Sequence, residues 1–91
     1  MNVEDIEQFL KNKASKDDQY IKIHFKKRDA IYGLFIKDND FNDLKSKNFW
    51  RIVTRPNFDA YEKSKNNGLA KIFCGLEFTR LTLYKDSFDN D

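Results

Sequence analysis

Residues 72–81 read IFCGLEFTRL, and a single glycine, Gly75, interrupts what is otherwise the apolar pattern of one strand. Glycine weakens the interior of a β-strand, so it usually marks a bulge, a bend or the close approach of another segment. Gly33 lies in a similar position, inside the apolar run AIYGLFIK of residues 30–37. We therefore assign structural roles to Gly33 and Gly75, as the points at which tightly curled strands bend.

The spacing of apolar side chains predicts five short strands. Residues 20–26 alternate between apolar and polar side chains, which is the pattern of a half-buried strand. Comparable runs predict further strands over residues 30–37, 49–54, 69–76 and 77–84. Residues 38–47 are interpreted as a loop, whereas residues 57–65 fit an irregular excursion, a short helix or a strand extension equally well.

A helix is expected before the first strand. Asn2 can cap its N-terminus, and Glu4 and Asp5 follow in the first turn, where the helix dipole favours acids. Because no helix alternates with the strands, a doubly wound α/β fold is disfavoured. The sequence thus predicts a mainly β fold in a single domain, residues 1–91. It comprises a helix over about residues 3–14, a strongly bent, five-stranded antiparallel barrel over about residues 19–84, and a polar tail over residues 85–91.

Composition excludes several classes of protein. Apolar residues make up 40% of the chain and charged residues 35%, which is typical of a soluble globular domain. No apolar run approaches the length of a membrane span, so no membrane contact is expected. The single cysteine forms no internal disulfide, and a reducing cytoplasmic location is expected. The net charge is +2, so any affinity for nucleic acid requires a local basic patch.

Two stretches resemble the Sm-like family: IKIHFKKRDAIYGLFI of residues 21–36 and AKIFCGLEFTRLTLY of residues 70–84. The first contains the family's basic turn and its apolar-x-Gly-x-apolar strand, and the second its closing apolar pair, glycine and final strand. KNFW of residues 47–50 is similar to the loop-Asn-apolar segment that begins the third strand. The resemblance implies an SH3-like barrel whose fourth and fifth strands leave edges that pair with neighbouring subunits.

The chain also departs from the family. Members that bind uridine-rich RNA usually carry Arg-Gly in the closing motif, whereas this chain has Cys74 before Gly75, and a thiol cannot replace the charged guanidinium fork. The connection between the second and third strands is longer than usual. The Tyr-Lys-His signature of the bacterial Sm-like RNA chaperones is absent. The resemblance therefore supports the fold more strongly than the RNA site.

A basic and aromatic patch is the leading candidate for RNA binding. Its residues are Lys45, Lys47, Asn48, Phe49 and Arg51. Proteins that bind single-stranded RNA combine cations for phosphates with aromatic rings for bases. The lysines would hold phosphates, Asn48 would bind a base edge and Phe49 would stack. The alternative is an ordinary solvated face in which the charges carry no function.

Catalytic and metal-binding patterns are weak. Cys74 and His24 could act as nucleophile and base, but no third group that would orient them is identifiable. Asp38, Asp40 and Asn42 match the start of an EF-hand loop, yet its glycine and its final glutamate are missing. We therefore expect a non-enzymatic protein without a cofactor, a metal or a small-molecule substrate.

The leading hypothesis is an Sm-like, non-enzymatic protein that binds single-stranded RNA through an oligomeric surface. The oligomer would be built from copies of this chain paired through residues 69–84. The alternative is a protein-interaction or scaffolding module on the same barrel, without nucleic acid.

Overall fold

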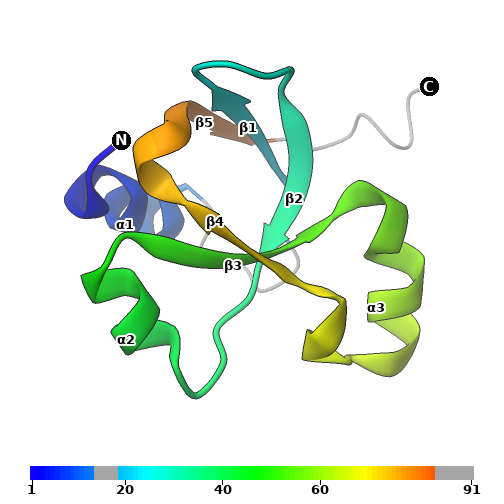
Figure 1. The fold of residues 1–91 in the computed structure, drawn as a ribbon. Helices are drawn as coiled ribbons and strands as arrows, with labels where there is room; N and C mark the ends of the chain where they lie inside the picture. Colours follow the sequence, from blue (N-terminus) through cyan, green and yellow to red (C-terminus); the bar gives the residue numbers. More distant parts are fainter. Residues whose placement is uncertain (14–18, 84–91) are drawn as a thin grey trace.

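The computed structural model describes residues 1–13 and 19–83 and contains helices and strands in nearly the predicted order (Figure 1). In chain order these are α1 (Val3–Asn12), β1 (Ile21–Phe25), β2 (Ile31–Phe35), α2 (Phe41–Ser46), β3 (Phe49–Thr54), α3 (Phe58–Ser64), β4 (Lys71–Cys74) and β5 (Phe78–Leu83). Single 3-10 turns, η1 (Arg55–Asn57), η2 (Asn67–Leu69) and η3 (Gly75–Glu77), lie before α3, before β4 and between β4 and β5. The predicted tail, residues 85–91, lies outside the described residues.

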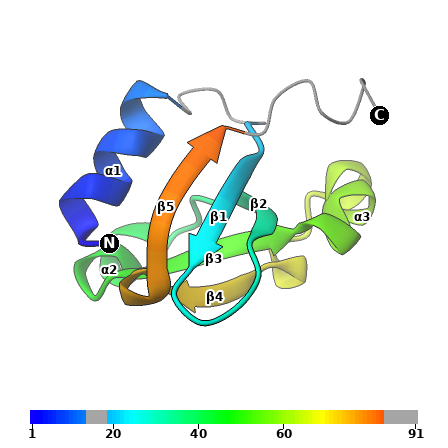
Figure 2. The same ribbon diagram turned by 90° about the horizontal axis from the view of Figure 1, so that it is seen from above.

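The N-terminal helix and the five-stranded antiparallel sheet are confirmed, but the sheet is not closed into a barrel. Its strand order is β4-β3-β2-β1-β5, which places β4 and β5 at the two edges. The sheet is strongly twisted, so that β3 and β4 run across the direction of β1 and β5 (Figure 2). Within residues 19–83, β4 pairs with β3 and β5 pairs with β1.

The turn η3 explains why consecutive strands β4 and β5 do not form a hairpin. The backbone N–H of Gly75 donates to the Asn48 carbonyl at 2.8 Å, and the Glu77 carbonyl accepts from the N–H of Lys26 at 3.0 Å. The hydrogen bonds of η3 are therefore directed to the turns before β3 and after β1. The strand before the turn, β4, and the strand after it, β5, therefore lie at different edges of the sheet.

Two apolar clusters cover the two faces of the central strands. The first cluster lies between α1 and the sheet and is centred on Trp50, Ile52 and Phe78. The second lies on the opposite face, where α3 places Phe58 against Val53 of β3. Burial on both faces explains why the consecutive residues Ile52 and Val53 of β3, which belong to different clusters, are both apolar. The two helices accordingly flank opposite sides of the molecule (Figure 2).

The helix content differs from the prediction, because α2 lies in the expected loop and α3 in the ambiguous segment. The chain is therefore mixed α/β and not mainly β. The N-terminus of α1 is capped as predicted, because the Asn2 side chain accepts a hydrogen bond from the N–H of Asp5 at 2.8 Å. In α2, Phe41 packs edge-on against the Trp50 ring, with centroids 6.0 Å apart. This contact with β3 stabilises α2, whereas no local sequence signal predicts a helix there.

Gly33 is required by a close approach of neighbouring side chains. A Cβ atom at this position would lie 2.5 Å from Cγ2 of Ile52 and 3.3 Å from Cδ1 of Ile23. Its φ angle is not positive, so conformational freedom is not the reason for glycine. The missing side chain lets the isoleucines of β1 and β3 meet across β2.

We predict that Gly33→Ala destabilises the fold by about 1–3 kcal/mol, the usual cost of overpacking a core. Urea denaturation measures the change. Gly68→Ala is the matched control: its Cβ would meet only the Asn66 side chain, at 3.0 Å and beyond, in an exposed turn. Equal losses in the two variants would contradict a specific packing role for Gly33.

Candidate nucleic-acid interface

The residues of the predicted patch, within residues 45–51, lie in several different environments in the structure. The Lys45 ammonium binds the Glu7 carboxylate of α1 at 2.6 Å, and this hydrogen bond lowers the pKa of Glu7 below its ordinary value. The Arg51 guanidinium pairs with Asp40 at the start of α2. Both cations are thus already neutralised by carboxylates within the chain.

Asn48 has a structural role, which replaces the predicted contact with a base edge. Its side chain is only 7% exposed, and its backbone has a positive φ of 62°. The amide oxygen Oδ1 accepts a hydrogen bond from Trp50 Nε1 at 2.7 Å, while Nδ2 donates to the Met1 carbonyl at 3.0 Å. A Cβ on Gly75 would lie 2.2 Å from the same Oδ1. Gly75 therefore serves this close approach.

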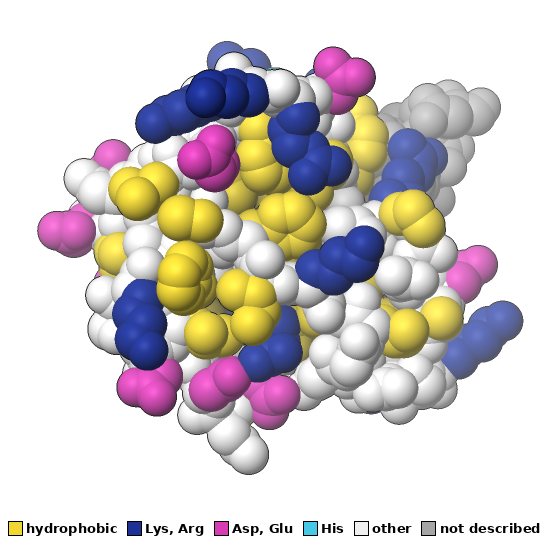
Figure 3. Space-filling model, in the orientation of Figure 1, with side chains coloured by type: hydrophobic (Ala, Val, Ile, Leu, Met, Phe, Trp, Pro, Cys, Tyr) yellow, Lys and Arg dark blue, Asp and Glu magenta, His cyan; other side chains and the backbone are white. Residues whose placement is uncertain are grey.

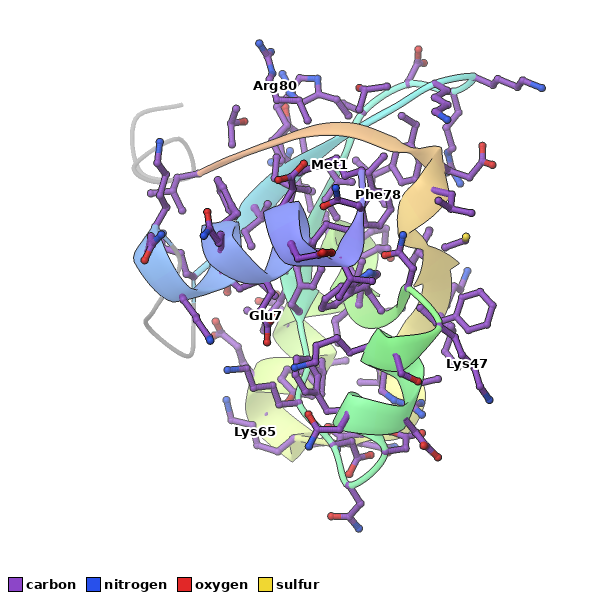
Figure 4. The ribbon with its side chains drawn as sticks, turned by 90° about the vertical axis from the view of Figure 1, so that its left-hand side faces the viewer. Met1, Glu7, Lys47, Lys65, Phe78 and Arg80 are labelled. Atoms are coloured by element: carbon purple, nitrogen blue, oxygen red, sulfur yellow. The ribbon has the colours of Figure 1, made fainter. Side chains whose placement is uncertain are left out.

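Lys47 and Phe49 are the members of the patch that remain exposed. Lys47 points away from the body of the protein in the view of Figure 4. Phe49 forms part of an apolar outer surface of β3, β4 and η3. On this surface the Ile72 side chain of β4 is 51% exposed and the Leu76 side chain of η3 is 59% exposed. One lysine and one ring do not make a basic groove, so this surface is better described as apolar.

A different set of cations and rings comes together at the ends of β2, β3 and β4. They line a pocket of about 380 Å³, named here the basic pocket. Its lining residues are Arg28, Ile31, Tyr32, Thr54, Arg55, Pro56, Lys71 and Phe73. In Figure 3, Lys and Arg side chains border apolar surface in the upper half of the face, between the segments that Figure 1 labels β2 and β4.

The basic pocket combines positive charge with aromatic walls. Arg28, Arg55 and Lys71 supply the charge, and none of the described residues that line the pocket carries a carboxylate. The Arg55 guanidinium lies 5.4 Å from the centroid of the Tyr32 ring. The centroid of the Phe73 ring lies 6.1 Å from that of Phe25, and the Phe25 ring also contacts the Phe78 ring and the Arg28 guanidinium. Such a pocket suits a planar, negatively charged ligand.

Sequence reasoning did not single out Arg28, Tyr32, Lys71 and Phe73, because they come from separate parts of the chain. The available signal was the basic turn of residues 26–28 together with Arg55-Pro56 at the end of β3. Only the strand order β4-β3-β2-β1 shows that these ends lie together. The order of the strands in the sheet therefore brings the lining residues of the pocket together.

The structure also places the residues weighed for other chemistry. His24 is on β1 and Cys74 on β4, strands that are separated by β2 and β3 in the sheet. Among residues 1–13 and 19–83, no group of three or more His, Cys, Asp and Glu side chains is positioned to hold a metal ion. No helix in this part of the chain is long and apolar enough to cross a bilayer.

Comparisons of the chain with models of known families, with curated proteins and with solved structures find no match.

We predict that Asn48→Ala lowers stability by about 1–3 kcal/mol, because it leaves the buried Trp50 N–H without its acceptor. Any RNA affinity that the parent shows should stay within twofold in the folded variant, because the Asn48 amide is used within the fold. Asn48→Gly serves as the control, since it removes the same amide but relieves the positive φ. Lost RNA affinity with unchanged stability would restore the base-reading role of Asn48.

Proposed function

We propose that this chain is a non-enzymatic, Sm-like protein that binds single-stranded RNA, and that the basic pocket is the binding site. The observation that carries the proposal is the gathering of Arg28, Arg55 and Lys71 around the Tyr32 and Phe73 rings, with no carboxylate among the described lining residues. Cations for phosphates and rings for bases are the two components of single-strand binding sites.

The fold supports the Sm-like part of the proposal. An N-terminal helix precedes five antiparallel strands, and the closing glycine, Gly75, begins the 3-10 turn between β4 and β5. The edge strands β4 and β5 are those through which we expect copies of this chain to associate. The exposed Ile72 on β4 supports such an interface.

In the proposed complex, a base enters the basic pocket and packs against Phe73 and the Tyr32 ring. Arg28 and Lys71 contact the flanking phosphates from the β1–β2 turn and from β4, and Arg55 contributes charge beside Tyr32. Stacking on the rings of the pocket accepts any base, because every base has a π face. The expected preference is therefore for single strands over duplexes, with weak discrimination among bases.

The alternative is a protein-interaction module, and the apolar outer surface of β3, β4 and η3 favours it. Phe49, Ile72 and Leu76 are the exposed large apolar side chains of the described chain. A yellow patch over β3 and β4 in Figure 3 corresponds to this region. Ile72→Ser/Leu76→Ser should abolish association with a protein partner or a second copy, without changing the charge of the basic pocket.

We predict that Arg28→Gln/Lys71→Gln weakens binding of a fluorescent uridine decanucleotide. Two lost phosphate contacts make the slope of log K against log salt shallower by about 1.4, since each contact on a single strand contributes about 0.7. Fluorescence anisotropy over a salt series measures both quantities.

Lys11→Gln/Lys47→Gln is the matched control for this experiment, because it removes the same charge from two exposed positions outside the pocket. It should leave the slope within error of the parent. If the parent chain itself shows no salt-dependent binding, the proposed function is wrong. If the control weakens binding as much as the pocket variant, the attraction is general and the pocket is not the site.

A further inference from the structure

The outer face of β1 and β5 carries a second group of cations. The register pairs Lys22 with Thr82 and His24 with Arg80 across these strands. Because side chains alternate along a strand, these residues point away from the core that contains Ile21, Ile23 and Leu81. Lys22, His24 and Arg80 are named here the basic row. Arg80 extends outward on the β5 side in Figure 4, well apart from Lys47.

Tyr32 connects the basic row to the basic pocket. The register pairs Tyr32 of β2 with Lys22 of β1, and the Lys22 ammonium lies 5.8 Å from the Tyr32 ring centroid. The same ring lines the pocket and has the Arg55 guanidinium 5.4 Å away. A series of cations therefore leads from the basic pocket across β2 and β1 to β5. None of the residues named in this series carries a carboxylate. Three strand spacings give a path of about 14 Å.

Among residues 1–13 and 19–83, no acidic side chain pairs with the basic row. Within the described chain, neither Lys22 nor Arg80 forms an ion pair. The Nε2 atom of His24 is shielded from solvent and has no hydrogen-bond partner among the described residues. Burial lowers the pKa of His24 below its ordinary value, and the charges of Arg80 and Lys22 lower it further. A phosphate bound beside these residues would offset the repulsion between the Lys22 and Arg80 charges and would favour the protonated imidazole.

We infer that a single strand bound in the basic pocket continues across the outer face of β2, β1 and β5, where Lys22, His24 and Arg80 hold its backbone phosphates. This inference rests on the proposed function. It deepens that function by giving the ligand a direction and a minimum length. A dinucleotide fills the pocket alone, whereas a longer strand reaches both sites.

The test compares a uridine dinucleotide with a uridine decanucleotide. Lys22→Gln/Arg80→Gln should weaken decanucleotide binding roughly tenfold near physiological salt, the order expected for two phosphate contacts, and make the salt slope shallower by about 1.4. Dinucleotide binding, followed by NMR chemical shifts, should not change. Arg28→Gln/Lys71→Gln should weaken both ligands, and Lys11→Gln/Lys47→Gln neither.

The outcomes separate the two proposals. Unchanged decanucleotide binding in Lys22→Gln/Arg80→Gln, together with loss in Arg28→Gln/Lys71→Gln, overturns the basic row and leaves the pocket in place. Equal losses for the two ligands also overturn the row, because the variant would then act on the pocket. No binding by the parent chain overturns the proposed function itself.

The pH dependence of decanucleotide affinity gives a further test of His24, because a purely structural role of this residue would not change it. His24 is the only histidine of the chain, and the charged groups that face it are Lys22 on its own strand and Arg80 on β5. A neighbouring phosphate raises the pKa of the imidazole, so decanucleotide affinity should increase as the pH falls from about 7.5 to 5.5. His24→Gln should remove this increase. Equal parent affinities at the two pH values would remove His24 from the row.

Discussion

The close approach of Asn48 and Gly75 is the contact on which the arrangement of the sheet depends. The Gly75 N–H donates to the Asn48 carbonyl, and the Asn48 side chain bonds both the Trp50 indole and the Met1 carbonyl. The Met1 amino group in turn donates to the carbonyls of Gly75 and Phe78. The start of β3, the turn between β4 and β5 and the entry to α1 are thereby fixed together. A side chain at position 75 would separate them.

This constraint determines which surfaces remain for a ligand. Asn48 and its neighbours are used to hold the fold, and α1 and α3 cover opposite faces of the central strands. Besides the apolar outer surface of β3, β4 and η3, the accessible surfaces of the described chain include the end of the sheet at the basic pocket and the outer face of β1 and β5. The last two surfaces are positively charged, although the chain as a whole has a net charge of only +2. Local concentration of charge, and not total charge, therefore supports the proposed RNA binding.

The strands could be predicted from the sequence, whereas the basic pocket could not, and both outcomes have the same physical reason. Alternation and glycine placement are local signals, and residues 49–54 form a strand with the predicted bounds. α2 depends on the contact of Phe41 with Trp50, which no local signal reveals. Two cations of the predicted patch of residues 45–51 instead pair with acids outside it: Lys45 with Glu7, 38 residues away, and Arg51 with Asp40, 11 residues away. The basic pocket requires the strand order, which composition and spacing do not contain.

The most direct test of the account is an NMR titration of the isotopically labelled chain with a uridine decanucleotide, following the backbone amides. The largest shift changes should fall on Arg28, Tyr32, Arg55 and Lys71 and extend to Lys22, His24 and Arg80. Lys47 and Phe49 should change little. Shift changes centred on residues 45–51, or none at saturating RNA concentration, would contradict it.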